Sequence, residues 1–154
     1  NKILIANIKD SYTRIQTIAH ECLHSIQGKR ILKFNFIYSN IYLLYFITIA
    51  ILAIFKINPD IWMMLLAILI ILGMTQLLVR NYLENDAMIK AKYLAKEYME
   101  ESKISTKVEI DDIVAQYDKI NIYGIRATNY YLFFNVCKNI IIFSLICFIR
   151  IVAF

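Results

Sequence analysis

The stretch Ile61–Val79, IWMMLLAILIILGMTQLLV, is an almost uninterrupted run of apolar residues. Its only notably polar members are Thr75 and Gln76. The hydrocarbon core of a bilayer is about 30 Å thick, and a helix needs roughly 20 apolar residues to cross it. The stretch therefore predicts a transmembrane helix. It is not a secretory signal peptide, because it lies well inside the chain and no cleavage site follows it.

A second apolar run, Phe36–Phe55, precedes this stretch and predicts another span. Residues 56–60 connect the two runs. In this connection Asn58 suits an N-cap, Pro59 fits the first position of a helix, and Asp60 complements the positive end of the helix dipole. The two runs therefore predict a tight transmembrane hairpin.

The third apolar run, Tyr130–Phe154, contains the charged residues Lys138 and Arg150. A Lys or Arg at the middle of a bilayer costs about 2.5–3.5 kcal/mol on insertion scales. The two residues lie roughly 18 Å apart along a helix, so each can extend its charge toward an opposite interface. We interpret the run as a third span. The alternative is a helix packed against the hairpin, with Lys138 facing a polar cavity.

The composition excludes several other classes of protein. Hydrophobic residues make up 60% of the 154 residues, against about 45–50% in soluble domains, and this rules out intrinsic disorder. The 3 glycines and 1 proline are too few for a turn-rich β-protein. The 3 cysteines are an odd number, which disfavours a disulfide-stapled secreted domain.

The basic residues indicate how the chain is oriented. Residues 1–35 and 80–129 contain 14 of the 17 Lys and Arg residues, whereas the hairpin connection contains only Lys56. By the positive-inside rule, both of these long segments are cytoplasmic. Topology thus accounts for the net charge of +5, and we find no nucleic-acid-binding motif.

Short signals predict the elements outside the apolar runs. Lys2–Ile5 has the pattern of a strand, and Tyr12–Gln27 has apolar residues at helical spacing. Arg80–Glu101 continues the second span as a helix. Thr106-Lys107-Val108-Glu109 is a capping box that begins a further helix. Gly124 predicts a break before the last apolar run.

One pentapeptide, His20-Glu21-Cys22-Leu23-His24, carries a recognisable chemistry. Residues four apart differ by roughly 40° around a helix, so His20 and His24 share one face and can bind one zinc ion. Glu21 lies beside that face, where it can accept a proton from zinc-bound water. Cys22 points away from that face.

A catalytic zinc usually has a third protein ligand, and this chain has no other histidine. The best carboxylate candidate is Glu84, because the hairpin returns the chain to the side of the histidine helix. Glu84 lies roughly 8 Å beyond Val79 along a helix. Asp86 is the alternative ligand, or it could orient a histidine by accepting a hydrogen bond.

These residues resemble a known family, the bacterial membrane proteins called neutral zinc metallopeptidases, type 2. That family has a His-Glu-x-Gly-His-Ala-x-Gln segment and, after a transmembrane hairpin, a Glu-x-Asp-Ala segment. Ala19–Gln27 and Glu84–Ala87 are similar to these two segments. The resemblance implies a zincin-like pair of helices in a bacterial cell membrane, with one zinc ion per chain. It implies His20, His24 and Glu84 as zinc ligands and Glu21 as the catalytic base.

The sequence departs from the family's pattern in two respects. Leu23 stands where the family has glycine, and the family has an upstream segment with another membrane span.

The oxyanion formed during peptide cleavage would need a donor besides zinc. Tyr131 is nearest to a tyrosine of the family's pattern, and Tyr123, Tyr130 and Arg126 are further candidates. The strand at Lys2–Ile5 would pair with a peptide substrate.

We therefore expect an all-α integral membrane protein with a short N-terminal edge strand, forming one metallopeptidase domain over residues 1–154. Its parts are the strand and histidine helix (1–35), the hairpin (36–79), the third-ligand and cytoplasmic helices (80–129), and the third span (130–154). The expected function is a zinc-dependent endopeptidase that cleaves peptides or membrane proteins, and the sequence leaves homo- and hetero-oligomers open.

Two other functions compete with this one. The chain could be a non-catalytic assembly or channel subunit of the membrane, with an incidental or degenerate zinc motif. It could also have kept a zincin fold only to bind a partner.

Overall fold

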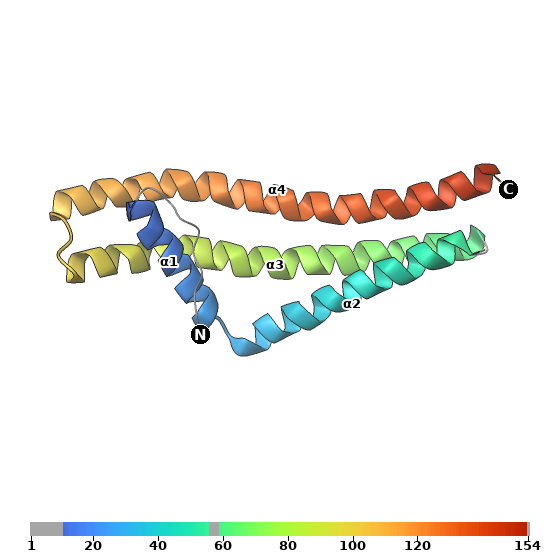
Figure 1. Ribbon diagram of the computed structural model, residues 1–154, viewed down its shortest axis with the longest axis horizontal. Helices are drawn as coiled ribbons and strands as arrows, with labels where there is room; N and C mark the ends of the chain where they lie inside the picture. The colour runs from blue at the N-terminus through green and yellow to red at the C-terminus, as the bar shows by residue number, and fades with distance from the viewer. Residues whose placement is uncertain (1–10, 56–58, 154) are drawn as a thin grey trace. The chain divides into compact units, whose positions relative to one another are not determined.

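The computed structural model describes residues 11–55 and 59–153, which form four α-helices (Figure 1). They are α1 (Ser11–Ile26), α2 (Lys29–Ile54), α3 (Pro59–Glu101) and α4 (Lys107–Ala153). Helix accounts for 94% of the described residues, which confirms the all-α prediction. The strand predicted at Lys2–Ile5 lies outside the described residues, and the part of the chain that is described contains no strand.

Two of the predicted helix starts are found where the local chemistry placed them. Pro59 is the first residue of α3, whereas its expected N-cap, Asn58, lies outside the described residues. The capping box precedes α4: the N–H of Thr106 donates to Oε2 of Glu109 at 2.9 Å, and the N–H of Glu109 donates to Oγ1 of Thr106 at 3.4 Å. These bonds satisfy N–H groups that the first turn of a helix leaves unpaired.

The break predicted at Gly124 is wrong. Helix α4 continues through Gly124 without interruption. A glycine inside a helix costs only about 1 kcal/mol relative to alanine, which is too little to end a long helix held by its neighbours. A Cβ at this position would lie 3.5 Å from the Cε of Met88, an ordinary contact distance.

Three of the helices are long and apolar enough to cross a membrane: Lys29–Ile54, Ile61–Glu101 and Lys107–Arg150. Large apolar side chains remain exposed along them, including Leu44, Ile71 and Phe148, each more than 60% exposed. Soluble proteins rarely leave extended apolar surfaces in water. The structure is thus compatible with an integral membrane protein that has three spans, and α3 continues beyond its apolar stretch as predicted.

The chain divides into two compact units. The first contains α1, residues 82–101 of α3 and residues 107–129 of α4. Helix α1 packs on the other two segments through a core that contains Ala19, Ala91, Ala95, Met99, Ile110 and Tyr117. The alanines recur on one face of α3 at four-residue spacing, and their small side chains let the helices approach closely. This packing holds α1 against α3.

The second unit contains residues 30–81 and 130–154. Its core is formed by Tyr42, Ile49, Ala53, Leu69, Phe143 and Cys147. Polar side chains also join its helices: Nδ2 of Asn139 donates to the hydroxyl of Tyr42 at 3.1 Å, and Nη1 of Arg150 donates to the carbonyl oxygen of Ala53 at 3.0 Å. The Arg150 bond satisfies a carbonyl near the C-terminal end of α2, where a positive charge is favourable.

Gly73→Ala is expected to destabilise the second unit. A Cβ at Gly73 would lie 2.7 Å from Cγ1 of Val136 and 3.2 Å from the hydroxyl of Tyr42, so these side chains or their helices would have to shift. Overpacking of this kind costs about 1–3 kcal/mol. Thermal unfolding in detergent measures the effect. Gly124→Ala is the matched control, and its higher helix propensity should leave stability unchanged or raised. Equal melting temperatures for the two variants would contradict close packing at Gly73.

Candidate metal centre

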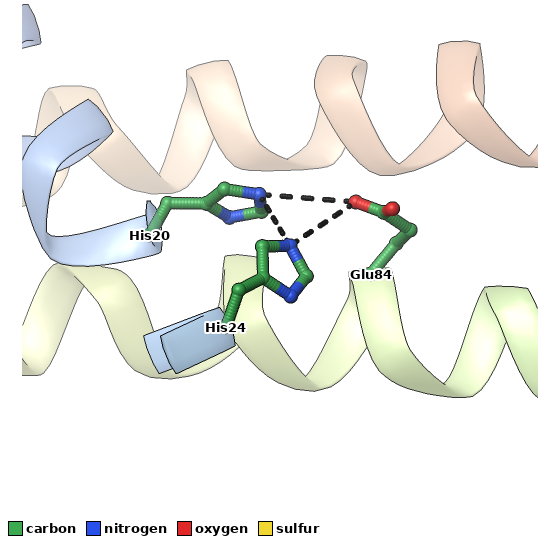
Figure 2. Close-up of side chains that lie close together, drawn as sticks. All are labelled: His20, His24 and Glu84. Atoms are coloured by element: carbon green, nitrogen blue, oxygen red, sulfur yellow. Dashed lines mark hydrogen bonds and ion pairs between the residues drawn. The ribbon is translucent and has the colours of Figure 1, made fainter. Parts of the chain in front are cut away.

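The first unit brings three predicted ligand residues together. His20 and His24 project from one face of α1, and Glu84 projects from α3 (Figure 2). All three side chains are half-buried, with exposed fractions of 18%, 24% and 23%. Ala19, which precedes His20, is buried against α3 and α4. The histidine face is therefore anchored by the core next to it.

The three ligand atoms form a compact triangle. Nε2 of His20 lies 3.0 Å from Nε2 of His24. Oε2 of Glu84 lies 3.8 Å from Nε2 of His20 and 3.5 Å from Nε2 of His24. Figure 2 shows the three side chains converging on one point. Among the described residues, this is a group of His, Cys, Asp or Glu side chains that could hold a metal ion.

The triangle has the size that zinc requires. The point equidistant from the three atoms lies about 2.0 Å from each of them, and zinc binds imidazole nitrogen at about 2.0–2.1 Å and carboxylate oxygen at about 2.0–2.2 Å. The donor set of two imidazoles and one carboxylate is also one that catalytic zinc uses, with a fourth position left for water. The residues present therefore fit a zinc ion.

Electrostatics favours the neutral, metal-binding form of His20. Burial lowers the pKa of His20 below its ordinary value, and the neighbouring His24 lowers that pKa further, whereas Glu84 and Glu21 raise it. A neutral imidazole keeps a lone pair for a metal, because ligands must bind in their deprotonated form. As metal ligands, two imidazoles and one carboxylate would together carry a charge of −1, so a bound divalent cation would leave the site with a net charge of +1.

Gln27 orients His24, a role that was not predicted. The side-chain amide of Gln27 donates from Nε2 to the carbonyl oxygen of Leu83 at 2.8 Å, and its Oε1 lies 2.9 Å from Nδ1 of His24. Because the amide nitrogen is directed at a carbonyl, its oxygen must accept from His24, and Nδ1 carries the proton. Nε2 of His24 then presents its lone pair to the centre of the triangle. The i, i+3 spacing of His24 and Gln27 was the available signal.

The two carboxylates that the sequence offered as the third zinc ligand have different surroundings. Glu84 lies in the triangle, whereas Asp86 pairs with Lys90 at 2.6 Å one helical turn away. Glu21, the predicted base, is half-buried on α1 next to His20, whose pKa it raises. Cys22 lines an apolar cavity of about 360 Å³ with Ile18 and Leu94 and is not part of the triangle, as its position on the helix predicted.

Tyr131, the predicted oxyanion donor, belongs to the second unit, whereas the triangle belongs to the first. Its side chain is 64% exposed. Its role in catalysis stays a prediction.

Comparisons of the chain with protein-family models, with curated proteins and with solved structures return no match.

Proposed function

We propose that this protein is a membrane-embedded, zinc-dependent endopeptidase of the kind represented by the type 2 neutral zinc metallopeptidases. The observation that carries the proposal is the convergence of His20, His24 and Glu84 on a point at zinc-binding distance. The three ligands come from two helices that are separated in sequence by the transmembrane hairpin. The motif and the topology therefore support one site together.

Each residue of the site has a distinct task in the proposed reaction. A zinc ion held here would activate a water molecule and polarise the carbonyl group of the scissile peptide bond. The carboxylate of Glu21 would take a proton from that water and pass it to the leaving amine. Gln27 would hold His24 in the tautomer that leaves Nε2 unprotonated.

The proposed substrate is a peptide or a membrane protein, and the proposed location is a bacterial cell membrane. Both segments that form the first unit are rich in Lys and Arg. The positive-inside rule then assigns the site to the cytoplasmic side of the membrane.

A cleavage assay tests the proposal. Purified protein in detergent would be incubated with fluorescently labelled casein, an unstructured polypeptide, with and without added zinc. Cleavage is expected with zinc, is expected to stop when a chelator removes the metal, and is expected to return when zinc is restored. Zinc-loaded protein that cleaves neither casein nor peptides drawn from transmembrane segments would contradict the peptidase assignment.

Gln27→Ala is expected to weaken zinc binding about 10–100-fold, because residues that orient a metal ligand have effects of this size. Competition with a zinc-binding dye measures the change in affinity. Ser25→Ala is the matched control, since the Ser25 hydroxyl is exposed and donates to the carbonyl of Cys22 in its own helix. Unchanged affinity in Gln27→Ala would show that the Gln27 amide does not position His24.

A further inference from the structure

A polar cavity lies within the second unit, among the helices expected to cross the membrane. It measures about 250 Å³ and is lined by residues of α2, α3 and α4. Its polar lining includes Ser39, Gln76, Arg80, Tyr131 and Asn135. Polar groups between membrane helices can simply join the helices.

The side-chain amide of Gln76 is only half satisfied. Its Nε2 donates to the hydroxyl oxygen of Ser39 at 2.6 Å, which links α3 to α2. Its Oε1 is buried and has no hydrogen-bond partner among the described residues. A buried acceptor without a donor is costly, and in native proteins such groups usually have a partner. A ligand that enters the cavity with an O–H or N–H donor would supply one.

Two basic side chains lie in or next to the same cavity. Arg80 lines it and is the first residue after the apolar stretch Ile61–Val79. Lys138 is exposed and donates to Oδ1 of Asn135, another lining residue, at 3.3 Å. A guanidinium group recognises phosphate oxygens through paired, charge-assisted hydrogen bonds. The lining of the cavity therefore includes a guanidinium group, which is suited to phosphate, and an amide oxygen that lacks a donor.

The position of the cavity indicates the source of that phosphate. The end of an apolar stretch that spans the bilayer core lies at the level of the lipid headgroups. The apolar residues Leu77, Leu132 and Val136 also line the cavity, so part of its wall suits hydrocarbon. Basic pockets between membrane helices on the cytoplasmic side are known to bind phospholipid headgroups.

We propose that this cavity binds the headgroup of a membrane phospholipid that carries a hydroxyl or ammonium donor in addition to its phosphate. Arg80 contacts the phosphate, Gln76 Oε1 accepts from the headgroup donor, and the apolar wall contacts the start of the acyl chains. This proposal goes beyond the proposed peptidase function, and the cavity lining contains none of the three residues of the triangle.

Native mass spectrometry of delipidated protein in detergent tests the proposal with two probes. Phosphatidylglycerol has hydroxyl donors in its headgroup, whereas phosphatidylcholine has a phosphate and no such donor. The wild type is expected to bind one phosphatidylglycerol and to prefer it about fivefold over phosphatidylcholine, the value of one hydrogen bond. Arg80→Gln is expected to weaken binding of both lipids about tenfold. Gln76→Leu is expected to remove only the preference.

Two variants serve as controls. Arg126→Gln removes an exposed charge in the first unit, and Thr75→Val removes a hydroxyl that donates to the Ile71 carbonyl of its own helix. Both should bind lipid as the wild type does. If Gln76→Leu does not fold, the exposed Arg80 still gives a decisive variant. Equal lipid binding by Arg80→Gln and wild type would overturn the proposal. Displacement of the lipid by inorganic phosphate at about 10 mM would also overturn it, because the site would then bind free phosphate.

Discussion

Glu21→Gln is expected to keep its zinc and to lose peptide cleavage by about 10²–10⁴-fold, the usual contribution of a general base. The substitution keeps the size of the side chain and removes only its ability to take a proton. His20, His24 and Glu84, the candidate zinc ligands that form the triangle, are untouched. The measurement is kcat for cleavage of a fluorogenic peptide, with zinc content determined on the same preparation.

Glu97→Gln is the control for this experiment, because Glu97 is an exposed carboxylate on α3 outside the triangle. It should cleave as fast as the wild type. If Glu21→Gln retained zinc and full activity, another group would have to act as the base, and the roles proposed for the motif would be wrong. A protein that uses the zincin fold only for binding would be unaffected by either substitution.

Glu84→Ala is expected to weaken zinc binding more than Gln27→Ala does. Loss of an orienting residue weakens metal binding about 10–100-fold, so the loss of affinity in Glu84→Ala should be larger than that. The reason is that Glu84 supplies the only negative charge and the only oxygen atom of the triangle. Competition against a chelator of known affinity measures the loss. This variant decides whether the third ligand was assigned to the right carboxylate.

Asp86→Ala is the matched control, two residues along the same helix. Asp86 pairs with Lys90, whose side chain is 59% exposed, and exposed ion pairs contribute about 0–1 kcal/mol. Zinc affinity should therefore not change. Loss of zinc in Asp86→Ala together with normal binding in Glu84→Ala would transfer the ligand role to Asp86.

Most of the helical architecture could be predicted because it depends on properties that are local in the sequence. The length of the run Ile61–Val79 predicts a span whatever surrounds it. Pro59 and the capping box at Thr106 precede helices because they match the chemistry of helix starts. These predictions do not depend on how the helices pack against one another.

Gly124 shows where local signals fail. A glycine can end a helix, or it can lie within one where a neighbour approaches, and the residue itself does not distinguish the two. Met88 approaches Gly124 from α3, and α4 continues through it. Gly73 lies against Val136 in the same way in the second unit. Both contacts join residues far apart in the sequence, so periodicity could not predict them.

Some residues of the candidate site could be predicted from the sequence, and one could not. The face shared by His20 and His24 follows from helix geometry alone. The approach of Glu84 required one further step, namely that a hairpin returns the chain to its starting side. Gln27 was missed because its second partner, the carbonyl of Leu83, is a backbone group on another helix. Side-chain spacing carries no information about such a partner.

Zinc binding by the triangle can be measured directly as the zinc content of the detergent-purified wild type and of His24→Ala, by elemental mass spectrometry. We expect about one zinc ion per chain in the wild type, as a single three-ligand site requires, and loss of that ion in His24→Ala. Wild-type protein that contains no zinc after zinc is resupplied would contradict the assignment of His20, His24 and Glu84 as zinc ligands. The chain would then be better explained as a non-catalytic membrane subunit with a degenerate motif.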